Sequence, residues 1–186
     1  MEYRIFDLKA STDEMIVEGY ATVFNRPYLL HEQDGYSVYE QIDRNAFDKC
    51  DMDNVIMQFD HAGQIYARTK NGTLKVKPDN YGLKVWANLG GTNRGQELYK
   101  EIKGKYITQM SFGFKVDKAG VTVEDTGDKR LLRTITAIAK LYDVSAVSIP
   151  ANDATEINAR NAGMMIIENR RKEQVRAIKD LLKNEL

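Results

Sequence analysis

Apolar and polar residues alternate over most of the first two-thirds of the chain, and this period of two is typical of β-strands that bury one face. Segments rich in β-branched and aromatic residues end at glycine, proline, asparagine or aspartate, which indicate turns. The segments expected to form strands are 15–24, 36–42, 55–61, 67–69, 72–76, 82–89, 106–116 and 131–148, the last as two strands or one bent strand. Asn71-Gly72 and Pro78-Asp79-Asn80 predict the turns of a central meander, and 120–130 a polar hairpin tip.

Helical patterns are few in this part of the chain. Thr92 is expected to cap a helix in which Leu98 and Ile102 form the buried stripe and Gly104 ends the last turn. Asp43 is expected to cap a short helical turn. The glycine-rich loop before the helix lacks the Lys-Ser/Thr pair of a phosphate-binding loop and does not match the dinucleotide fingerprint, so we interpret it as a turn and helix cap.

The composition changes from about residue 160 onward. Segment 168–186 is rich in charge and has apolar residues at helical spacing, which predicts an amphipathic helix that packs on the domain or on a partner, or forms a separable tail. We therefore expect a domain over 1–159 and a helical tail over 160–186 that is a candidate for removal. The predicted fold is a β-dominated α+β architecture, a closed or nearly closed antiparallel β-barrel with flanking helices.

The charges of the chain balance, with 27 basic and 27 acidic residues, whereas nucleic-acid-binding proteins usually carry a basic excess. No apolar run approaches the roughly 20 residues that cross a bilayer, and the start of the chain lacks the apolar core of a signal peptide. The single Cys50 cannot form an intramolecular disulfide and has no cluster of zinc ligands around it. We expect a cytosolic protein that binds no nucleic acid, membrane, metal or cofactor.

The strand expected over 106–116 presents a serine on its polar face. Alternation places Phe112 and Phe114 on the apolar face and Ser111 on the opposite one, beside Gly113, which has no side chain. A serine held on a rigid strand, away from the core, is well placed to act as a nucleophile when an imidazole lies within hydrogen-bond reach.

The chain contains only two histidines that could activate this serine. His61 ends a predicted strand, where alternation gives it the same face as Val55, Met57 and Phe59. His31 lies in a turn-rich polar segment and is expected at the surface. His61 is therefore the candidate base.

A catalytic triad also needs a group that orients the imidazole. Asp143 interrupts a long apolar segment, where a carboxylate is costly to bury without a partner, so it is either the third member or a residue at a strand bulge or edge that meets solvent. Glu40 and Asp60 are weaker substitutes, and Ser145 is a rival nucleophile because it shares the alternation face of Asp143. The sequence lacks a Gly-Xaa-Ser-Xaa-Gly elbow, which disfavours an α/β-hydrolase.

An ordered set of short motifs over about residues 3–157 resembles the prohead maturation proteases of tailed phages, relatives of the herpesvirus assemblins. In chain order the motifs are Gly19-Tyr20-Ala21-Thr22-Val23-Phe24, Glu40-Gln41-Ile42 with Ala46-Phe47, Phe59-Asp60-His61, Gly72-Thr73-Leu74 with Gly82-Leu83, Met110-Ser111-Phe112-Gly113-Phe114, and Asp143-Val144-Ser145 before Pro150-Ala151-Asn152. Each motif is short, and the specificity of the resemblance comes from their order and spacing.

The resemblance implies a serine endopeptidase with an assemblin-like barrel, in which Ser111 is the nucleophile and His61 the base. The herpesvirus relatives use a second histidine as third member; this chain has none near the matching segment, and Asp143 is the natural replacement. Family members work inside the immature capsid in the host bacterial cytoplasm. They cut the scaffold, or the scaffolding segment of the major capsid protein, and commonly themselves, and dimerisation of related viral proteases leaves a homodimer possible. The alternatives are a non-catalytic capsid-associated scaffolding protein and, less favoured by the balanced charge, a nucleic-acid-binding barrel.

Overall fold

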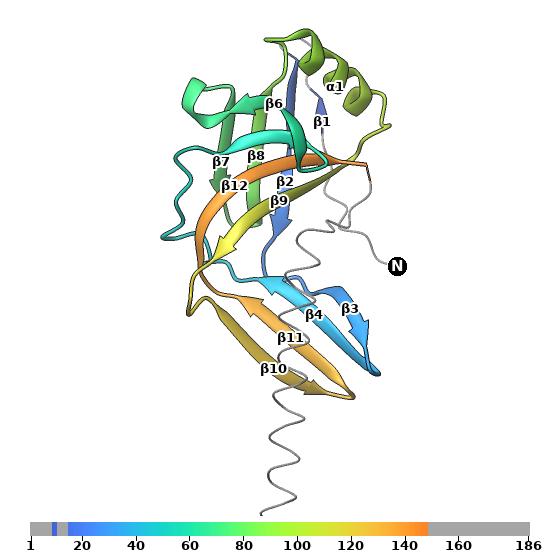
Figure 1. Cartoon of the computed structure of the whole chain (residues 1–186), viewed down its shortest axis with the longest axis vertical. Coiled ribbons are helices and arrows are strands. Elements are labelled where there is room, and N and C mark those ends of the chain that lie inside the picture. The colour runs from blue at the N-terminus through green and yellow to red at the C-terminus, as the bar shows by residue number, and fades with distance from the viewer. Residues whose placement is uncertain (1–8, 11–14, 149–186) are drawn as a thin grey trace, which may run out of the picture.

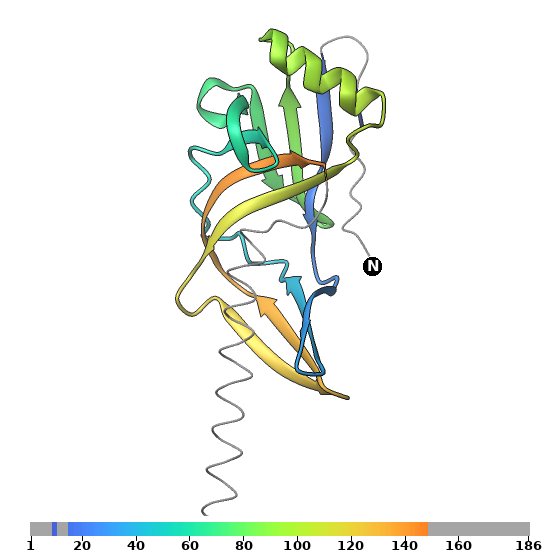
Figure 2. The ribbon, with the colours of Figure 1, turned by 45° about the vertical axis from the view of Figure 1, so that its right-hand side comes forward.

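The computed structural model describes residues 9–10 and 15–148 of the 186-residue chain. The described part is dominated by strands, with one α-helix and one turn of 3-10 helix (Figures 1 and 2). The elements are β1 (Lys9–Ala10), β2 (Ile16–Val23), β3 (Tyr28–Gln33), β4 (Tyr36–Ile42), β5 (Ile56–Phe59), β6 (Ala62–Arg68), η1 (Thr69–Asn71), β7 (Leu74–Pro78), β8 (Gly82–Asn88), α1 (Asn93–Lys103), β9 (Gln109–Val116), β10 (Val121–Gly127), β11 (Arg130–Ile135) and β12 (Ile138–Val147).

The strands form three four-stranded sheets rather than the predicted barrel. Their strand orders are β1-β2-β8-β7 in the first, β6-β5-β12-β9 in the second and β10-β11-β4-β3 in the third, and none of them closes on itself. Figure 1 shows β9 and β12 curving together across the first sheet, while the sheet of β3, β4, β10 and β11 lies apart below them. Strand β2 packs beside β9, and β6 beside β7, but no hydrogen-bonded ladder joins either pair. The barrel prediction is therefore wrong, although the β-dominated class is confirmed.

The predicted antiparallel pairing holds for most ladders but not for all of them. Strand β11 runs parallel to β4, and β12 runs parallel to β5, whereas the remaining ladders are antiparallel. Parallel neighbours require a long crossover, and both pairs join segments far apart in the sequence. The local alternation that predicts each strand carries no information about such distant partners.

One large apolar cluster joins the sheet of β2 and β8 to the sheet of β9 and β12. Its fully buried members include Leu83, Met57, Phe112 and Leu141. A smaller cluster of Leu30, Val38 and Leu131 lies on the third sheet. The large cluster fixes one face of β9 and β12, which leaves their other face for polar side chains.

Most predicted elements form close to their expected positions, including the helix. Thr92 Oγ1 accepts a hydrogen bond from the Gly95 N–H at 3.0 Å, and Leu98 and Ile102 are buried, as predicted. Gly104 ends the helix with φ −75°, so no left-handed conformation requires glycine there. Asp43 caps a short turn, as predicted, because its Oδ1 accepts a hydrogen bond from the Asn45 N–H at 2.8 Å.

Other predictions need correction or fall outside the described residues. His31 lies on β3 rather than in a loop, and the segment expected as a hairpin tip forms strand β10 and the start of β11. The predicted tail over 160–186 lies outside the described residues. Among the described residues, no helix combines the length and apolar character needed to span a bilayer.

Candidate active site

Strands β9 and β12 bring four of the chemically interesting residues onto one polar face. Their antiparallel register sets Ser145 opposite Ser111 and Asp143 opposite Gly113. Residues two apart on a strand share a face, so these four lie on the side of the sheet opposite Phe112 and Val144, which are buried in the apolar core.

His61 reaches this face from a tight turn and not from a strand. Phe59 of β5 pairs with Ala62 of β6, so Asp60 and His61 form a two-residue hairpin loop, with φ 48° and 55°. Positive φ at both central residues is the signature of a type I′ turn, which asparagine and glycine normally occupy. The prediction that His61 continues the apolar face of β5 is therefore wrong, because the turn redirects its side chain.

The His61 imidazole and the Asp143 carboxylate form a direct contact across 82 positions of sequence. His61 Nδ1 lies 2.6 Å from Asp143 Oδ1, and each side chain is 13 % exposed. Asp143 was expected either to meet solvent at a bulge or to serve as a partner for histidine. A bulge is present between Leu141 and Asp143, and the carboxylate nevertheless meets the imidazole.

Asp143 is also held by Ser145 and accommodated by Gly113. Ser145 Oγ donates a hydrogen bond to Asp143 Oδ1 at 2.7 Å, the same oxygen that His61 contacts. A Cβ on Gly113 would lie 2.1 Å from Asp143 Oδ2. The carboxylate therefore occupies the volume that any other residue at position 113 would fill. In the sequence, this role of Gly113 was indicated only by its place two residues after Ser111 on the polar face of the strand.

Ser111 lies on the predicted face but is less accessible than a solvated serine. Its exposure is 5 %, and Ser145 is fully buried. Among the described residues, no hydrogen bond joins Ser111 Oγ to the imidazole, while His61 Nε2 is buried and has no hydrogen-bond partner there. The outer nitrogen of the imidazole thus keeps its hydrogen-bonding capacity unused among the described residues.

The alternative acids and the second histidine are engaged elsewhere. Both oxygens of Asp60 accept hydrogen bonds from Ser148, through its N–H and its hydroxyl, at 2.8 Å each. Glu40 is buried on the third sheet, where Arg133 and the Tyr28 hydroxyl bind its two oxygens. Burial lowers the pKa of Arg133 to about 10, so the guanidinium stays charged at neutral pH. His31 lies on the same sheet, away from β12.

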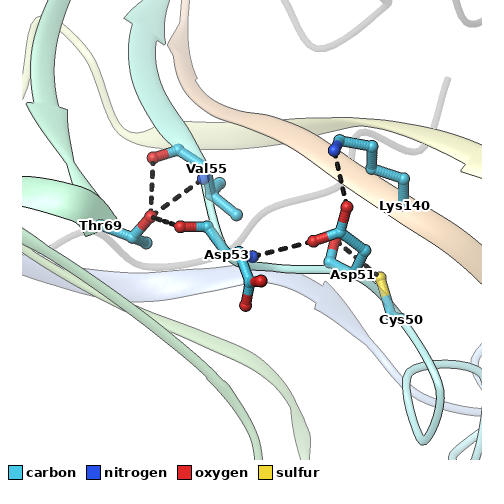
Figure 3. A network of polar contacts seen from close by, with 6 residues as sticks. All are labelled: Cys50, Asp51, Asp53, Val55, Thr69 and Lys140. Carbon is cyan, nitrogen blue, oxygen red and sulfur yellow. Dashed lines mark hydrogen bonds and ion pairs between the residues drawn. The ribbon is translucent and has the colours of Figure 1, made fainter.

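A polar network fixes the start of β5 against β12 (Figure 3). Asp51 pairs with the backbone of β12 and accepts a hydrogen bond from Lys140 Nζ at 2.6 Å. Thr69 Oγ1 accepts a hydrogen bond from the Val55 N–H at 3.0 Å, which ties the same segment to the end of β6. Burial raises the pKa of the neighbouring Cys50 thiol to about 11. This network holds β5 in the parallel register that carries the His61 turn to Asp143.

The residues that gather on this face are not arranged as a metal site. Within residues 9–10 and 15–148, no group of histidine, cysteine, aspartate and glutamate side chains could hold a metal ion. An imidazole that contacts a carboxylate and lies on the same face as two serine hydroxyls can instead accept a proton from a hydroxyl.

A family model described as caudovirus prohead serine protease matches residues 2–170. The matched range includes the whole described part of the chain and all of the polar face formed by β9, β12 and the His61 turn. No curated protein and no solved structure gives a significant match.

Proposed function

The chain belongs to the caudovirus prohead serine protease family, and from that premise we propose that Ser111, His61 and Asp143 form its catalytic triad. The substrate we propose is the scaffold, or the scaffolding segment of the major capsid protein, together with the protease itself. The reaction would take place inside the phage prohead in the host cytoplasm. Residues 1–159 would form the protease domain, and 160–186 would be a site of self-cleavage. A homodimer remains a candidate assembly.

The observation that carries this proposal is the contact between His61 and Asp143. Nδ1 of His61 faces the carboxylate at 2.6 Å, so its hydrogen is held there and the lone pair belongs to Nε2. A base needs this tautomer, because Nε2 must accept a proton. The buried Nε2 has no competing partner among the described residues.

In the proposed reaction, Ser111 Oγ attacks the carbonyl carbon of the scissile peptide while His61 Nε2 takes its proton. His61 then gives this proton to the leaving amine, and an acyl-enzyme remains on Ser111. A water molecule repeats the two steps and releases the acid. Asp143 keeps the imidazole in its tautomer and stabilises the imidazolium, while backbone N–H groups would hold the oxyanion.

Two observations favour Ser111 over Ser145 as the nucleophile. The Ser145 hydroxyl already donates its hydrogen to Asp143 at 2.7 Å and is fully buried. Ser111 Oγ makes no hydrogen bond among the described residues, and the residue as a whole is 5 % exposed. A hydroxyl that can turn its hydrogen toward Nε2 is the better candidate.

Co-expression with the major capsid protein of the same phage tests the proposal. Intact-mass spectrometry should show loss of a capsid segment, or of the protease tail, with wild type and not with Ser111→Ala. Ser37→Ala is a matched control, because it removes a serine hydroxyl from the third sheet and should leave the cuts unchanged. Cleavage with Ser111→Ala would move the nucleophile elsewhere. Absence of cleavage with every variant would favour the non-catalytic scaffolding role.

A further inference from the structure

We propose that Ser145 is a positioning residue of the same site, whose hydroxyl orients the Asp143 carboxylate against His61; this inference rests on the proposed function. Asp143 Oδ1 receives two contacts, from His61 Nδ1 at 2.6 Å and from Ser145 Oγ at 2.7 Å. Ser145 lies two residues after Asp143 on β12, with its side chain on the same face.

The geometry restricts the carboxylate on each of its two oxygens. The Ser145 hydroxyl and the imidazole share Oδ1, while Oδ2 lies over the space left by Gly113. A carboxyl group can otherwise rotate about its bond to Cβ, since this torsion has broad minima. Because each oxygen has its own place, Asp143 presents only Oδ1 to His61 Nδ1, and the imidazole keeps one orientation.

The second contact also changes the charge that the imidazole feels. A hydroxyl that donates to Oδ1 withdraws negative charge from the oxygen that faces His61. Removal of this donor leaves more negative charge on the oxygen that contacts the imidazole and frees the carboxylate to turn. The neighbouring carboxylate of the same turn, Asp60, is occupied by Ser148.

Burial distinguishes this role from an ordinary surface hydrogen bond. Ser145 is fully buried, and a hydroxyl in such a position is costly unless it is bonded. Its hydrogen bond goes to the carboxylate that contacts the His61 imidazole. If the hydroxyl only filled space, its removal in Ser145→Ala would not affect proton transfer.

The test uses the full-length protein and a fluorophosphonate probe, which reports the reactivity of Ser111 without any knowledge of the natural substrate. Ser111 Oγ attacks phosphorus, fluoride leaves, and His61 accepts the proton. Labelling rates are measured from pH 5 to pH 10 for wild type, Ser145→Ala and Ser145→Thr, and peptide mapping locates the label. Thr22→Ala is the control, because Thr22 is a buried hydroxyl on β2. Circular dichroism confirms that each variant is folded.

For Ser145→Ala we expect a labelling rate roughly tenfold lower than that of wild type. Ser145→Thr keeps the donor and should restore the rate, and Thr22→Ala should match wild type. An unchanged rate for folded Ser145→Ala, or a loss that Ser145→Thr does not reverse, would overturn the role of Ser145 while Ser111 remains labelled. A wild-type protein without label on Ser111, or with label on Ser145, would instead overturn the proposed triad.

Discussion

Substitution of Gly113 by alanine tests the site with a single methyl group. The new Cβ would lie 2.1 Å from Asp143 Oδ2 and 3.2 Å from its Cγ. Non-bonded carbon and oxygen atoms need roughly 3.2 Å or more, so the carboxylate must retreat by about 1 Å. The contact with His61 Nδ1, now 2.6 Å, would then exceed hydrogen-bond length.

The expected consequence is a large loss of activity with a modest change in stability. A misplacement of about 1 Å in a catalytic group costs on the order of 100-fold in rate. Alanine in a strand avoids the roughly 0.5–1 kcal/mol entropic cost of glycine, while the overpacked methyl costs about 1–3 kcal/mol. The free energy of unfolding should therefore fall by at most about 2.5 kcal/mol, which leaves the protein folded.

Fluorophosphonate labelling and urea unfolding measure the two quantities on the same samples. Gly91→Ala is the matched control, because a Cβ there meets no atom within 4 Å, and it should behave as wild type in labelling. In the double variant Gly113→Ala/Asp143→Ala the methyl group has no carboxylate to displace, so it should add little to the loss caused by Asp143→Ala alone. The reasoning would be refuted if Gly113→Ala were labelled at the wild-type rate. It would also be refuted if the loss of labelling in the double variant equalled the product of the losses in the two single variants.

Three further predictions concern the surroundings of the site. Asp60→Ala removes both hydrogen bonds to Ser148 at the strained turn and should lower the free energy of unfolding by roughly 1–3 kcal/mol; urea unfolding with the same stability as wild type would contradict this. Burial raises the pKa of the Cys50 thiol from 9.0 to about 11, so at pH 8 it should react with Ellman's reagent roughly 100-fold more slowly in the folded protein than in urea. The rate in the folded protein should rise until about pH 11. Equal rates in the folded protein and in urea would show that the thiol is not desolvated. Glu40→Ala leaves the Arg133 guanidinium buried without its carboxylate and should cost about 3–5 kcal/mol in unfolding experiments, whereas Glu32→Ala, at an exposed position, should cost little.

The strands and the residues of the candidate site could be picked out from the sequence because both depend on local patterns. Alternation identifies the polar face of β9, and the scarcity of histidine directs attention to His61. The pairing of strands was not predictable by this means. Register between β5 and β12 depends on contacts such as Asp51 with Lys140, which lie 89 positions apart, and a pattern of period two does not encode them.

The turn at Asp60 and His61 illustrates a second limit. Hairpin loops with positive φ at both positions normally reveal themselves through asparagine and glycine, and here the residues are aspartate and histidine. Such conformations cost of order 1–3 kcal/mol per residue and occur mainly where the surroundings enforce them. The two hydrogen bonds from Ser148 to Asp60 provide that enforcement. We infer that the strain is retained because the turn aims the imidazole at β12.

The bulge at Tyr142 reconciles the two interpretations that the sequence left open for Asp143. In a regular strand, Leu141 and Asp143 would share a face, and Leu141 is buried in the core. The register shift between them inserts one residue, so that Leu141 packs with Phe114 while Asp143 turns to the side of Gly113. Bulges re-aim side chains in this way beside active sites. The irregularity that would otherwise expose the carboxylate to solvent is therefore what delivers it to His61.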